Sequence, residues 1–459
     1  MTSGENDPKA RGGVLLVSCY ELGRQPLGVA WPAGFLREAG FDPVCRDVSV
    51  RPLTRVEIRH AAVAVISVPM HTAMRMGVSV AEAIRAVQPR CRVVFFGLYA
   101  VLNSAALMAD GAAACLGGES EEELVSLIRG WDNEDALDRS PDTGKRHQRF
   151  RVPDRSTLPD LERYAKFEAS GRSEAVLVGS VEASRGCRHL CTHCPIPPVY
   201  RGRFVAVPED VVLADIAQQV AAGARHITFT DPDFLNGPGH ALRLARGLHA
   251  AHRHVSFDFT AKIEHLVERG DVLPELVDCG AAFVVTAVES LNAKVLEILH
   301  KGHTPADVLT ALERTRMAGL PMRPTWMPFT PWATIDDFRE IIGFVESAGL
   351  VTHVDPVQFS IRLLVPPGSL LEDHPEFLAF RGDLDRQAFS WTWRYADPRM
   401  EGLQREVAAR VEADARDQFG EETTFARIRD LAGGSLTCHA AVATIDSPPA
   451  PRLTEDWFC

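Results

Sequence analysis

Short apolar runs alternate with helical patterns over the first third of the chain. The apolar runs lie at 14–18, 63–68 and 92–96, and patterns with apolar residues at helical spacing lie at 29–39 and 79–87. Apolar runs of this length between helices are typical of parallel strands that are buried on both faces. Residues 1–130 are therefore expected to form a Rossmann-like domain, with ligands at the carboxyl edge of its sheet.

The same alternation returns after residue 175. Six further apolar runs lie at 175–181, 226–230, 255–260, 282–288, 322–327 and 357–364. Six strands with helices between them suit an open (β/α)6 partial barrel, of the TIM-barrel kind, over residues 176–385. The polar, proline-containing stretch 131–175 is expected to be a linker. Residues 386–459 are expected to form a small helical region with an extended tail, so the whole chain is of the α/β class.

Composition and charge narrow the range of partners. The chain has 459 residues and a net charge of −12, and no dense run of lysine and arginine occurs in it. We therefore expect neither nucleic acid nor an anionic membrane as a partner. The start of the sequence lacks a basic segment followed by an apolar one, and no stretch of about 20 apolar residues occurs. These features predict a cytoplasmic protein.

Three of the ten cysteines fall within one short segment. Cys187, Cys191 and Cys194 have the spacing C-x3-C-x2-C, which arises by chance in roughly half a percent of chains with this cysteine content. Three thiolates leave one iron of a [4Fe–4S] cluster open to a chelating ligand, unlike the closed clusters with four cysteines. The alternative is zinc, because His189 and His193 add nitrogen donors in the same loop. Under the cluster interpretation, His189 faces solvent or caps the loop and His193 packs near the cluster.

This loop and the order of the domains resemble radical SAM enzymes with an amino-terminal cobalamin-binding domain. The matching segments are Cys187-Arg-His-Leu-Cys191-Thr-His-Cys194-Pro, Gly117-Gly118-Glu119-Ser-Glu-Glu122, Thr230-Asp231-Pro-Asp233-Phe234, Glu289-Ser290 and Lys301-Gly-His-Thr304. The resemblance implies that the three cysteines hold a [4Fe–4S] cluster, which binds and reductively cleaves S-adenosylmethionine (SAM). It also implies a small-molecule substrate and an electron donor such as flavodoxin or ferredoxin.

The resemblance assigns cofactor-binding roles to residues at the strand ends. Asp231 and Asp233 match an acidic segment near the SAM amino group, and their alternative role is to cap the next helix. Glu289 and Ser290 match a pair that contacts the ribose of SAM.

Two basic residues near strand ends are further candidates. Lys262 and Arg362 could hold the SAM carboxylate, and the alternative for each is a plain salt bridge.

The sequence leaves two alternatives for cobalamin binding by the first domain. Cobalamin-binding domains that supply a histidine to the metal carry Asp-x-His-x-x-Gly after the first strand, whereas this chain has Cys19-Tyr-Glu-Leu-Gly-Arg24. Many radical SAM relatives without that histidine also exist, so the domain could bind cobalamin or serve only as a scaffold. His71, on a predicted loop, is either a substitute ligand or a structural residue.

The end of the sequence carries a further resemblance. The segments Val68-Pro-Met-His71-Thr-Ala, Asp355-Pro-Val-Gln-Phe-Ser-Ile-Arg-Leu-Leu-Val-Pro-Pro-Gly368-Ser and Pro451-Arg-Leu-Thr-Glu-Asp-Trp457-Phe458-Cys459 resemble the CUAEP/CCAEP-tail radical SAM proteins. Tails of that family continue with cysteine or selenocysteine and then Ala-Glu-Pro, so a selenocysteine codon read as a stop is one hypothesis for the last residue here.

The resemblance makes Cys459 the candidate catalytic thiol. Trp457 and Phe458 are expected to be buried at the mouth of the barrel and to direct Cys459 toward SAM. A thiol there would bind a soft atom, and related tailed enzymes transfer a 3-amino-3-carboxypropyl group from SAM to arsenic during arsinothricin biosynthesis. The alternative is a tail that only covers an apolar seam.

The sequence therefore predicts a radical SAM enzyme that transfers a SAM-derived carbon group to a small-molecule acceptor. One alternative is a cobalamin-dependent radical SAM methyltransferase. The alternative of another class is a metal- or cluster-binding protein without turnover.

Overall fold

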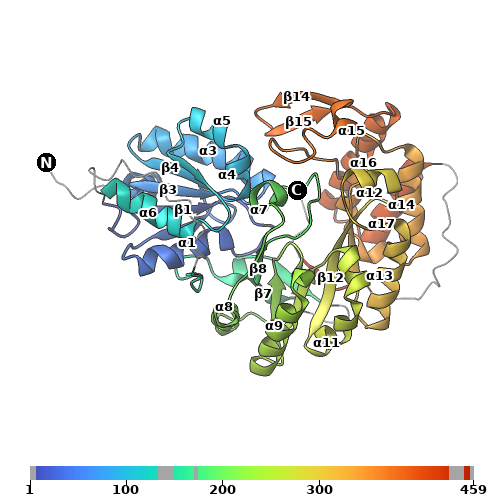
Figure 1. The fold of residues 1–459 in the computed structure, drawn as a ribbon, viewed down its shortest axis with the longest axis horizontal. Coiled ribbons are helices and arrows are strands. Elements are labelled where there is room, and N and C mark those ends of the chain that lie inside the picture. The colour runs from blue at the N-terminus through green and yellow to red at the C-terminus, as the bar shows by residue number, and fades with distance from the viewer. Residues whose placement is uncertain (1–6, 133–148, 170–173, 434–448, 455–459) are drawn as a thin grey trace.

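The structure is a computed structural model that describes residues 7–132, 149–169, 174–433 and 449–454. It has two α/β parts that lie side by side, with helix α7 (Ile196–Tyr200) near their junction (Figure 1). Within the described ranges, no helix is long and apolar enough to cross a membrane.

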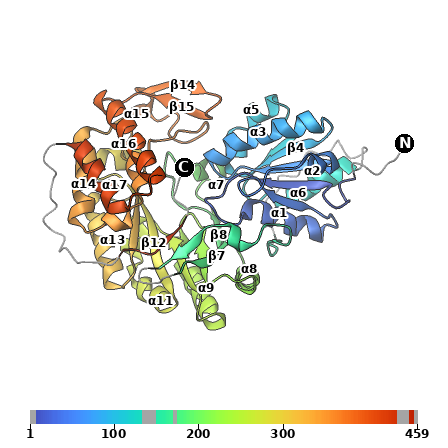
Figure 2. The same cartoon turned by 180° about the vertical axis from the view of Figure 1, so that it is seen from behind.

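The first part is a parallel five-stranded sheet in the order β2-β1-β3-β4-β5. The strands are β1 Val14–Ser18, β2 Val44–Asp47, β3 Val63–Ser67, β4 Arg92–Phe96 and β5 Ala114–Leu116. The helices are α1 Leu27–Glu38, α2 Arg55–His60, α3 His71–Val87, α4 Leu98–Leu102, α5 Ser104–Ala109 and α6 Glu121–Asp132. Helices α1 and α6 cover one face, and α3 and α5 cover the other (Figures 1 and 2). Every residue of β1 and β3 is buried, which explains their continuous apolar runs and confirms the predicted Rossmann-like fold.

The second part is a half-barrel built on a seven-stranded sheet in the order β13-β12-β11-β10-β7-β6-β16. Its parallel strands are β7 Val176–Val181, β10 His226–Phe229, β11 Ser256–Thr260, β12 Ala281–Glu289 and β13 Met322–Trp326. The helices between and after them are α8 Glu209–Ala221, α9 Pro238–Ala251, α10 Ile263–Glu268, α11 Leu273–Asp278, α12 Ala293–Ile298, α13 Pro305–Met317 and α14 Ile335–Ser347. The predicted partial barrel is thus confirmed, and its carboxyl edge carries the cysteine loop.

The sixth predicted strand, at 357–364, is wrong. Residues Pro356–Ser360 form a 3-10 helix, η6, and only a single parallel bridge joins Phe329 to Arg362. The Gln358 side chain accepts a hydrogen bond from the backbone N–H of Trp326 at 3.1 Å. A side chain therefore satisfies the edge of β13 where a sixth strand would have paired.

Two short antiparallel strands extend the half-barrel beyond β7. Strand β6 (Lys166–Glu168) comes from the predicted linker, and β16 (Arg452–Leu453) comes from the predicted tail. Because β16 is antiparallel to β6 and β6 is antiparallel to β7, β16 runs in the same direction as β7.

The C-terminal region packs against both parts of the molecule. It consists of α15 Pro375–Leu378, the hairpin β14 Arg381–Asp385 and β15 Ser390–Trp393, and helices α16 Arg399–Arg416 and α17 Glu421–Ala432. At the tip of the hairpin, Phe389 is 8% exposed and belongs to the apolar core of the first domain. The predicted domain limits stay predictions; the one between residues 385 and 386 falls within this hairpin.

Candidate active site

The cysteine loop begins where strand β8 (Ser184–Gly186) ends. Gly186 has φ +75°, and a Cβ there would lie 2.3 Å from the Arg203 carbonyl oxygen, so the turn into the loop requires glycine. Cys187 and Cys191 are buried and Cys194 is partly buried. Burial, followed by repulsion from the other two thiols, raises the pKa of Cys194 to about 12. All three thiols belong to one loop that starts at the end of β8, as the ligands of a shared cluster would.

Contacts with the half-barrel hold this loop in place. The Thr192 hydroxyl donates to the Ile298 carbonyl at 2.8 Å, and the Thr192 N–H donates to the Leu299 carbonyl at 3.1 Å. The Asn236 amide nitrogen lies 3.6 Å from the Cys187 sulfur, and its oxygen accepts from the Arg188 N–H at 3.3 Å. Sequence reasoning missed Asn236, although it follows the acidic segment Asp231-Pro-Asp233-Phe-Leu closely enough to suggest a loop contact.

Glu289 lies at the centre of a charged group beside the loop. Its backbone has φ +67° at a register shift of β12, which is strained for a residue other than glycine. Its carboxylate lies 3.2 Å from Lys301 Nζ and 3.5 Å from His193 Nε2. Burial opposes ionisation, but Lys301 and then His193 lower the pKa of Glu289 to about 2. The structure thus brings the predicted residues His193 and Glu289 together, with Lys301 between Glu289 and the cysteines.

The two aspartates after β10 have different surroundings. Asp231, which is 2% exposed, accepts the Ala183 N–H at 2.9 Å and the Ser184 hydroxyl, and burial raises its pKa to about 7. Asp233 Oδ1 accepts the Leu235 N–H at 3.0 Å, which is the capping role considered from the sequence. Asp233 Oδ2 instead faces His265, at 2.7 Å from its Nδ1.

Lys262 and Ser290 also lie at the carboxyl edge of the half-barrel. Lys262 Nζ is 3.1 Å from Glu264 Oε2, and Ser290 Oγ accepts the Asn292 N–H at 3.1 Å. Both side chains therefore already have partners within the protein.

Arg362, the second of the two predicted basic residues, has different neighbours. Arg362 is held by the C-terminal region: its guanidinium carbon lies 4.1 Å from the Trp393 ring centroid, and Nη2 donates to the Trp393 carbonyl at 2.9 Å. Nη1 lies 3.6 Å from Glu401. These contacts include the kind of salt bridge that was the alternative role of Arg362 from the sequence.

The two histidines of the cysteine loop contact different residues. His193 faces Glu289, whereas His189 turns inward to His265 and Glu264. The expectation that His189 faces solvent or caps the loop is wrong, because only 16% of its side chain is exposed and its ring lies 4.8 Å from that of His265. The zinc site considered from the sequence, with both histidines beside the cysteines, finds no support in this arrangement.

A cavity of about 540 Å³ lies between the carboxyl edges of the two sheets. Apolar side chains form much of its wall, including Leu27, Trp31, Met70, Phe96 and Tyr200. Four glycines and four acidic residues also line it; these are Gly28, Gly97, Gly118, Gly186, Glu21, Glu121, Glu182 and Asp231. The cavity opens beside strand β8 and helix α7, which flank the cysteine loop, so a molecule bound in it would lie next to the loop.

Glu21 stands in the loop after β1 where a cobalamin-binding motif would place its histidine. Its carboxylate accepts the N–H groups of Leu27 at 2.9 Å and of Gly28 at 3.1 Å, and so caps α1. Burial raises the pKa of Glu21 to about 7, although these two hydrogen bonds oppose the rise. His71 is not on a loop but begins α3, and its Nε2 contacts the Ala388 carbonyl of the hairpin.

Arg185 joins the cysteine strand to the first domain. Its guanidinium lies 2.7 Å from Glu121 and 2.8 Å from Glu182, and its Cζ is 4.9 Å from the Trp31 ring centroid and 5.2 Å from that of Phe150. The side chain is 5% exposed. Glu121 belongs to the Gly-Glu-x-Glu segment noted in the sequence, which thus has a structural partner beside the cavity.

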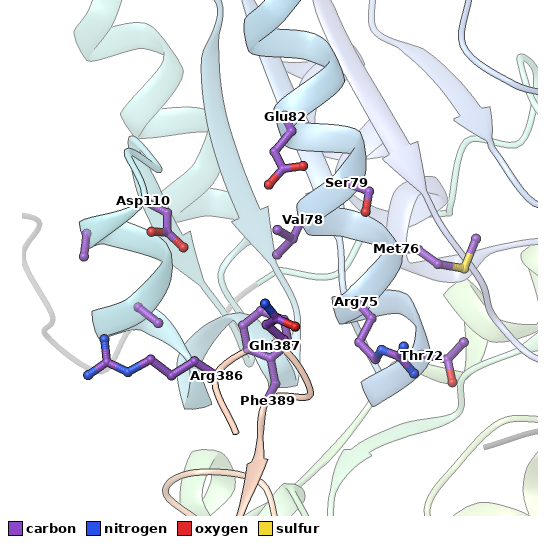
Figure 3. Close-up of a pocket in the computed structure, with 12 residues that line it drawn as sticks. Thr72, Arg75, Met76, Val78, Ser79, Glu82, Asp110, Arg386, Gln387 and Phe389 are labelled. Carbon is purple, nitrogen blue, oxygen red and sulfur yellow. The ribbon is translucent and has the colours of Figure 1, made fainter. Parts of the chain in front are cut away.

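A second pocket, of about 840 Å³, lies between α3, α5 and the tip of the β14–β15 hairpin. Figure 3 shows Arg75, Glu82, Asp110 and Arg386 around Phe389, with both signs of charge on the wall. None of its lining residues belongs to the cysteine loop, so this pocket reflects how the hairpin docks on the first domain.

Cys459, Trp457 and Phe458 lie outside the described residues. The tail is described only as far as Thr454, whose N–H donates to the Lys166 carbonyl at 2.8 Å. Arg452 pairs with Glu168 and Glu421, both at 3.0 Å.

Residues 181–345, from the end of β7 to α14, match the family model of the Radical SAM superfamily. This segment of the chain is thus similar to the Radical SAM superfamily. Members of this superfamily use a [4Fe–4S] cluster and SAM, and the predicted cofactors agree with that similarity.

Curated relatives match the middle of the chain at low identity. The tRNA-2-methylthio-N(6)-dimethylallyladenosine synthases of Salmonella paratyphi B and Salmonella newport are each 24% identical over 295 residues, which cover 59% of this chain and 56% of the relative. The chain thus spans just over half the length of these relatives.

Two solved structures share the fold. The cobalamin-dependent SAM radical enzyme OxsB, with aqua-cobalamin and SAM bound, has a TM-score of 0.69 at 15% identity, covering 91% of this chain and 71% of OxsB. The radical SAM methyltransferase TsrM from Kitasatospora setae, with cobalamin and a [4Fe–4S] cluster bound, has a TM-score of 0.54 at 17% identity, covering 71% and 68%. The likeness to OxsB extends over both α/β parts, so the two proteins share the fold of both parts.

Proposed function

We propose that the chain is a radical SAM enzyme in which Cys187, Cys191 and Cys194 bind a [4Fe–4S] cluster and a SAM-derived carbon group passes to a small molecule. The observation that carries this proposal is the convergence of three thiols at the carboxyl edge of the half-barrel, next to Glu289 and Lys301. When bound, the cluster supplies one electron that breaks an S–C bond of SAM and leaves a carbon radical.

The residues around the thiols fit such a cluster. Lys301 is 3% exposed, and its pKa is raised: burial lowers it, but Glu289 and then Cys191 more than compensate. A fixed ammonium and the Asn236 amide beside the thiols would offset the negative charge of a thiolate-ligated cluster. Glu289 and His193 present an ionised carboxylate and an imidazole at the same edge, where they could accept hydrogen bonds from the ribose or amino group of SAM. Five further residues remain proposed cofactor ligands, although each already has a partner in the protein. They are Asp231, Asp233, Lys262, Ser290 and Arg362.

The test is anaerobic reconstitution of the purified protein, followed by reduction in the presence of SAM. We expect about four irons and four sulfides per chain, and an EPR signal that changes when SAM is added. Cys187→Ala, Cys191→Ala and Cys194→Ala should each abolish SAM cleavage, whereas the buried control variants Cys45→Ala and Cys91→Ala should retain it. SAM cleavage by any of the three loop variants would refute the assignment.

The cleavage product identifies the transferred group. Methylthioadenosine would indicate that the 3-amino-3-carboxypropyl part of SAM is released as the reactive fragment, and 5′-deoxyadenosine would indicate cleavage on the ribose side. Arsenite is the first acceptor to test, since the sequence resemblance points to a soft atom. Deoxyadenosine alone, with no carbon transfer to any soft acceptor, would exclude this form of the proposal.

The direction of β16 supports a role for Cys459. Thr454 lies level with Leu177 through its bonds to β6, and β16 points along β7 toward the carboxyl edge. Five extended residues span about 17 Å, and the rest of β7 spans about 13 Å. Deletion of residues 457–459 should therefore lower product formation more than SAM binding, and unchanged turnover would leave Cys459 without a part in the reaction.

The second candidate is a cobalamin-dependent radical SAM methyltransferase. The specific observation in its favour is the largely apolar 540 Å³ cavity, whose glycine edges allow close approach to a flat ring. Glu21 and Asp231, with pKa values near 7, could donate or accept hydrogen bonds from amide groups at the rim. Stoichiometric corrin absorbance after expression with cobalamin would favour this candidate, and its absence would favour the first.

A further inference from the structure

Three metal-ligating side chains converge beside the cysteine loop and are not among the proposed ligands of the cluster. His189 comes from the loop itself, Asp233 follows β10, and His265 lies in α10 after β11. Their nearest ligand atoms all lie within 4.8 Å of one another.

The two imidazoles face each other through the same kind of nitrogen. His189 Nε2 lies 3.3 Å from His265 Nε2. The other nitrogen of each ring faces a carboxylate: His189 Nδ1 is 3.4 Å from Glu264 Oε2, and His265 Nδ1 is 2.7 Å from Asp233 Oδ2. The His189 ring has the orientation common in metal-binding histidines, with a carboxylate at one nitrogen and the metal at the other.

Two buried atoms in this group lack a hydrogen bond. Asp233 is fully buried and His265 is 8% exposed. Neither Asp233 Oδ2 nor His265 Nδ1 has a partner of hydrogen-bonding geometry among the described residues, although the two atoms are near each other. Buried polar atoms without partners are costly, and a cation held at this point would compensate Asp233 directly.

We propose that His189, Asp233 and His265 bind one divalent metal ion of the zinc type, through both Nε2 atoms and Asp233 Oδ2. Zinc bonds of about 2.0–2.2 Å place tetrahedral ligand atoms roughly 3.3–3.5 Å apart. The two Nε2 atoms are already at that separation, His189 Nε2 is 4.0 Å from Asp233 Oδ2, and no two of the ligand atoms are more than 4.8 Å apart. Closure around one ion therefore needs shifts of up to about 1.4 Å. Glu264 or water would complete the coordination.

The ion would tie the cysteine loop to the ends of β10 and β11. Its ligands include none of the cysteines, so the site does not depend on the proposed reaction. Lys262 lies nearby, but its ammonium is paired with Glu264 at 3.1 Å.

The experiment measures zinc in the protein with its cluster in place. Anaerobically reconstituted protein receives one equivalent of zinc chloride, passes over a chelating resin, and is analysed for zinc, iron and sulfide. We expect about one zinc per chain beside the full iron content. His265→Ala should reduce zinc at least tenfold and keep the iron, whereas His254→Ala, a control at an exposed histidine, should keep both.

Zinc K-edge absorption then identifies the ligands without any variant. Nitrogen and oxygen neighbours at about 2.0–2.1 Å support the site, and sulfur neighbours near 2.3 Å would show that zinc occupies the cysteines instead. The protein with all three loop cysteines replaced by alanine should still bind zinc. Failure of the reconstituted protein to retain zinc, sulfur ligation, or equal retention by His265→Ala would each overturn the proposal, whatever the outcome of the SAM assay.

Discussion

Replacing Arg185 by methionine should destabilise the junction between the two α/β parts. The substitution keeps much of the apolar length of the side chain but removes the charge that Glu121 and Glu182 share. Leaving buried carboxylates without their cation costs about 3–5 kcal/mol. Loss of the contacts with the Trp31 and Phe150 rings adds about 0.5–2 kcal/mol. We therefore expect the free energy of unfolding to fall by about 3.5–7 kcal/mol at pH 7.5, the sum of these ranges.

Urea unfolding, followed by tryptophan fluorescence and by circular dichroism, measures this loss. Trp31 lies under the guanidinium, so its emission reports on the junction itself. The deficit should shrink as the pH is lowered toward 5, because a buried carboxylate without its cation binds a proton more readily in the folded protein than in the unfolded chain.

Arg151→Met is the matched control. Arg151 also pairs with a glutamate, Glu38, and lies over an aromatic ring, at 5.6 Å from the Phe35 centroid, but 30% of its side chain and 57% of that of Glu38 are exposed. An exposed pair of this kind contributes about 0–1 kcal/mol. If Arg185→Met lowers the free energy of unfolding by no more than Arg151→Met does, then burial does not strengthen the contribution of Arg185 to stability, and the reasoning is refuted.

Two further substitutions test the walls of the cavity. Glu21 has a pKa of about 7 in the folded protein and 4.5 as its ordinary value, so wild-type stability should fall as the pH rises from about 4.5 to 7. Glu21→Gln should gain stability relative to wild type over that window, by at most about 3 kcal/mol. If the urea midpoints of the variant and of wild type differ by the same amount at pH 5 and at pH 8, this prediction is contradicted. Gly28→Ala places a Cβ 2.1 Å from Ser67 Oγ, so it should lower the free energy of unfolding by about 1–3 kcal/mol. Gly402→Ala, in a helix with open space around it, should instead stabilise by about 0.4–1 kcal/mol, and thermal unfolding that ranks the two glycine variants the other way would refute the packing argument.

Local sequence patterns were sufficient for most of the fold. Strands β1 and β4 lie within the predicted apolar runs because both faces of a parallel sheet are buried there, and apolar content then marks the whole strand. Helices α16 and α17 were likewise visible as patterns at helical spacing. The run at 357–364 misled because burial alone does not distinguish a strand from another buried segment. The hydrogen bond from Trp326 to Gln358 that replaces the pairing is a tertiary contact.

The candidate site was predictable only where ligands are close in sequence. The three cysteines share one loop, so their spacing alone indicated a common centre. Glu289, His193 and Lys301 meet because a strand end, the loop and the segment after α12 share one edge of the sheet. That edge was predicted, but which residues face one another across it depends on details such as the left-handed backbone of Glu289.

His189 shows why the remaining contacts could not be read from the sequence. In the chain it stands between Cys187 and Cys191, and proximity in sequence suggested either a role in the same centre or an exposed position. In the fold its ring turns away from the cysteines to His265, 76 residues later, because the loops after β10 and β11 lie beside the cysteine loop. A histidine with a carboxylate at one nitrogen and a second histidine at the other forms a set of possible metal ligands that is separate from the cysteines. The carboxyl edge therefore presents two neighbouring sets of ligands, one of sulfur and one of nitrogen and oxygen. Thiolates suit iron–sulfur clusters as well as zinc, and imidazole with carboxylate also suits zinc. The two proposals together therefore place iron in the first set and zinc in the second.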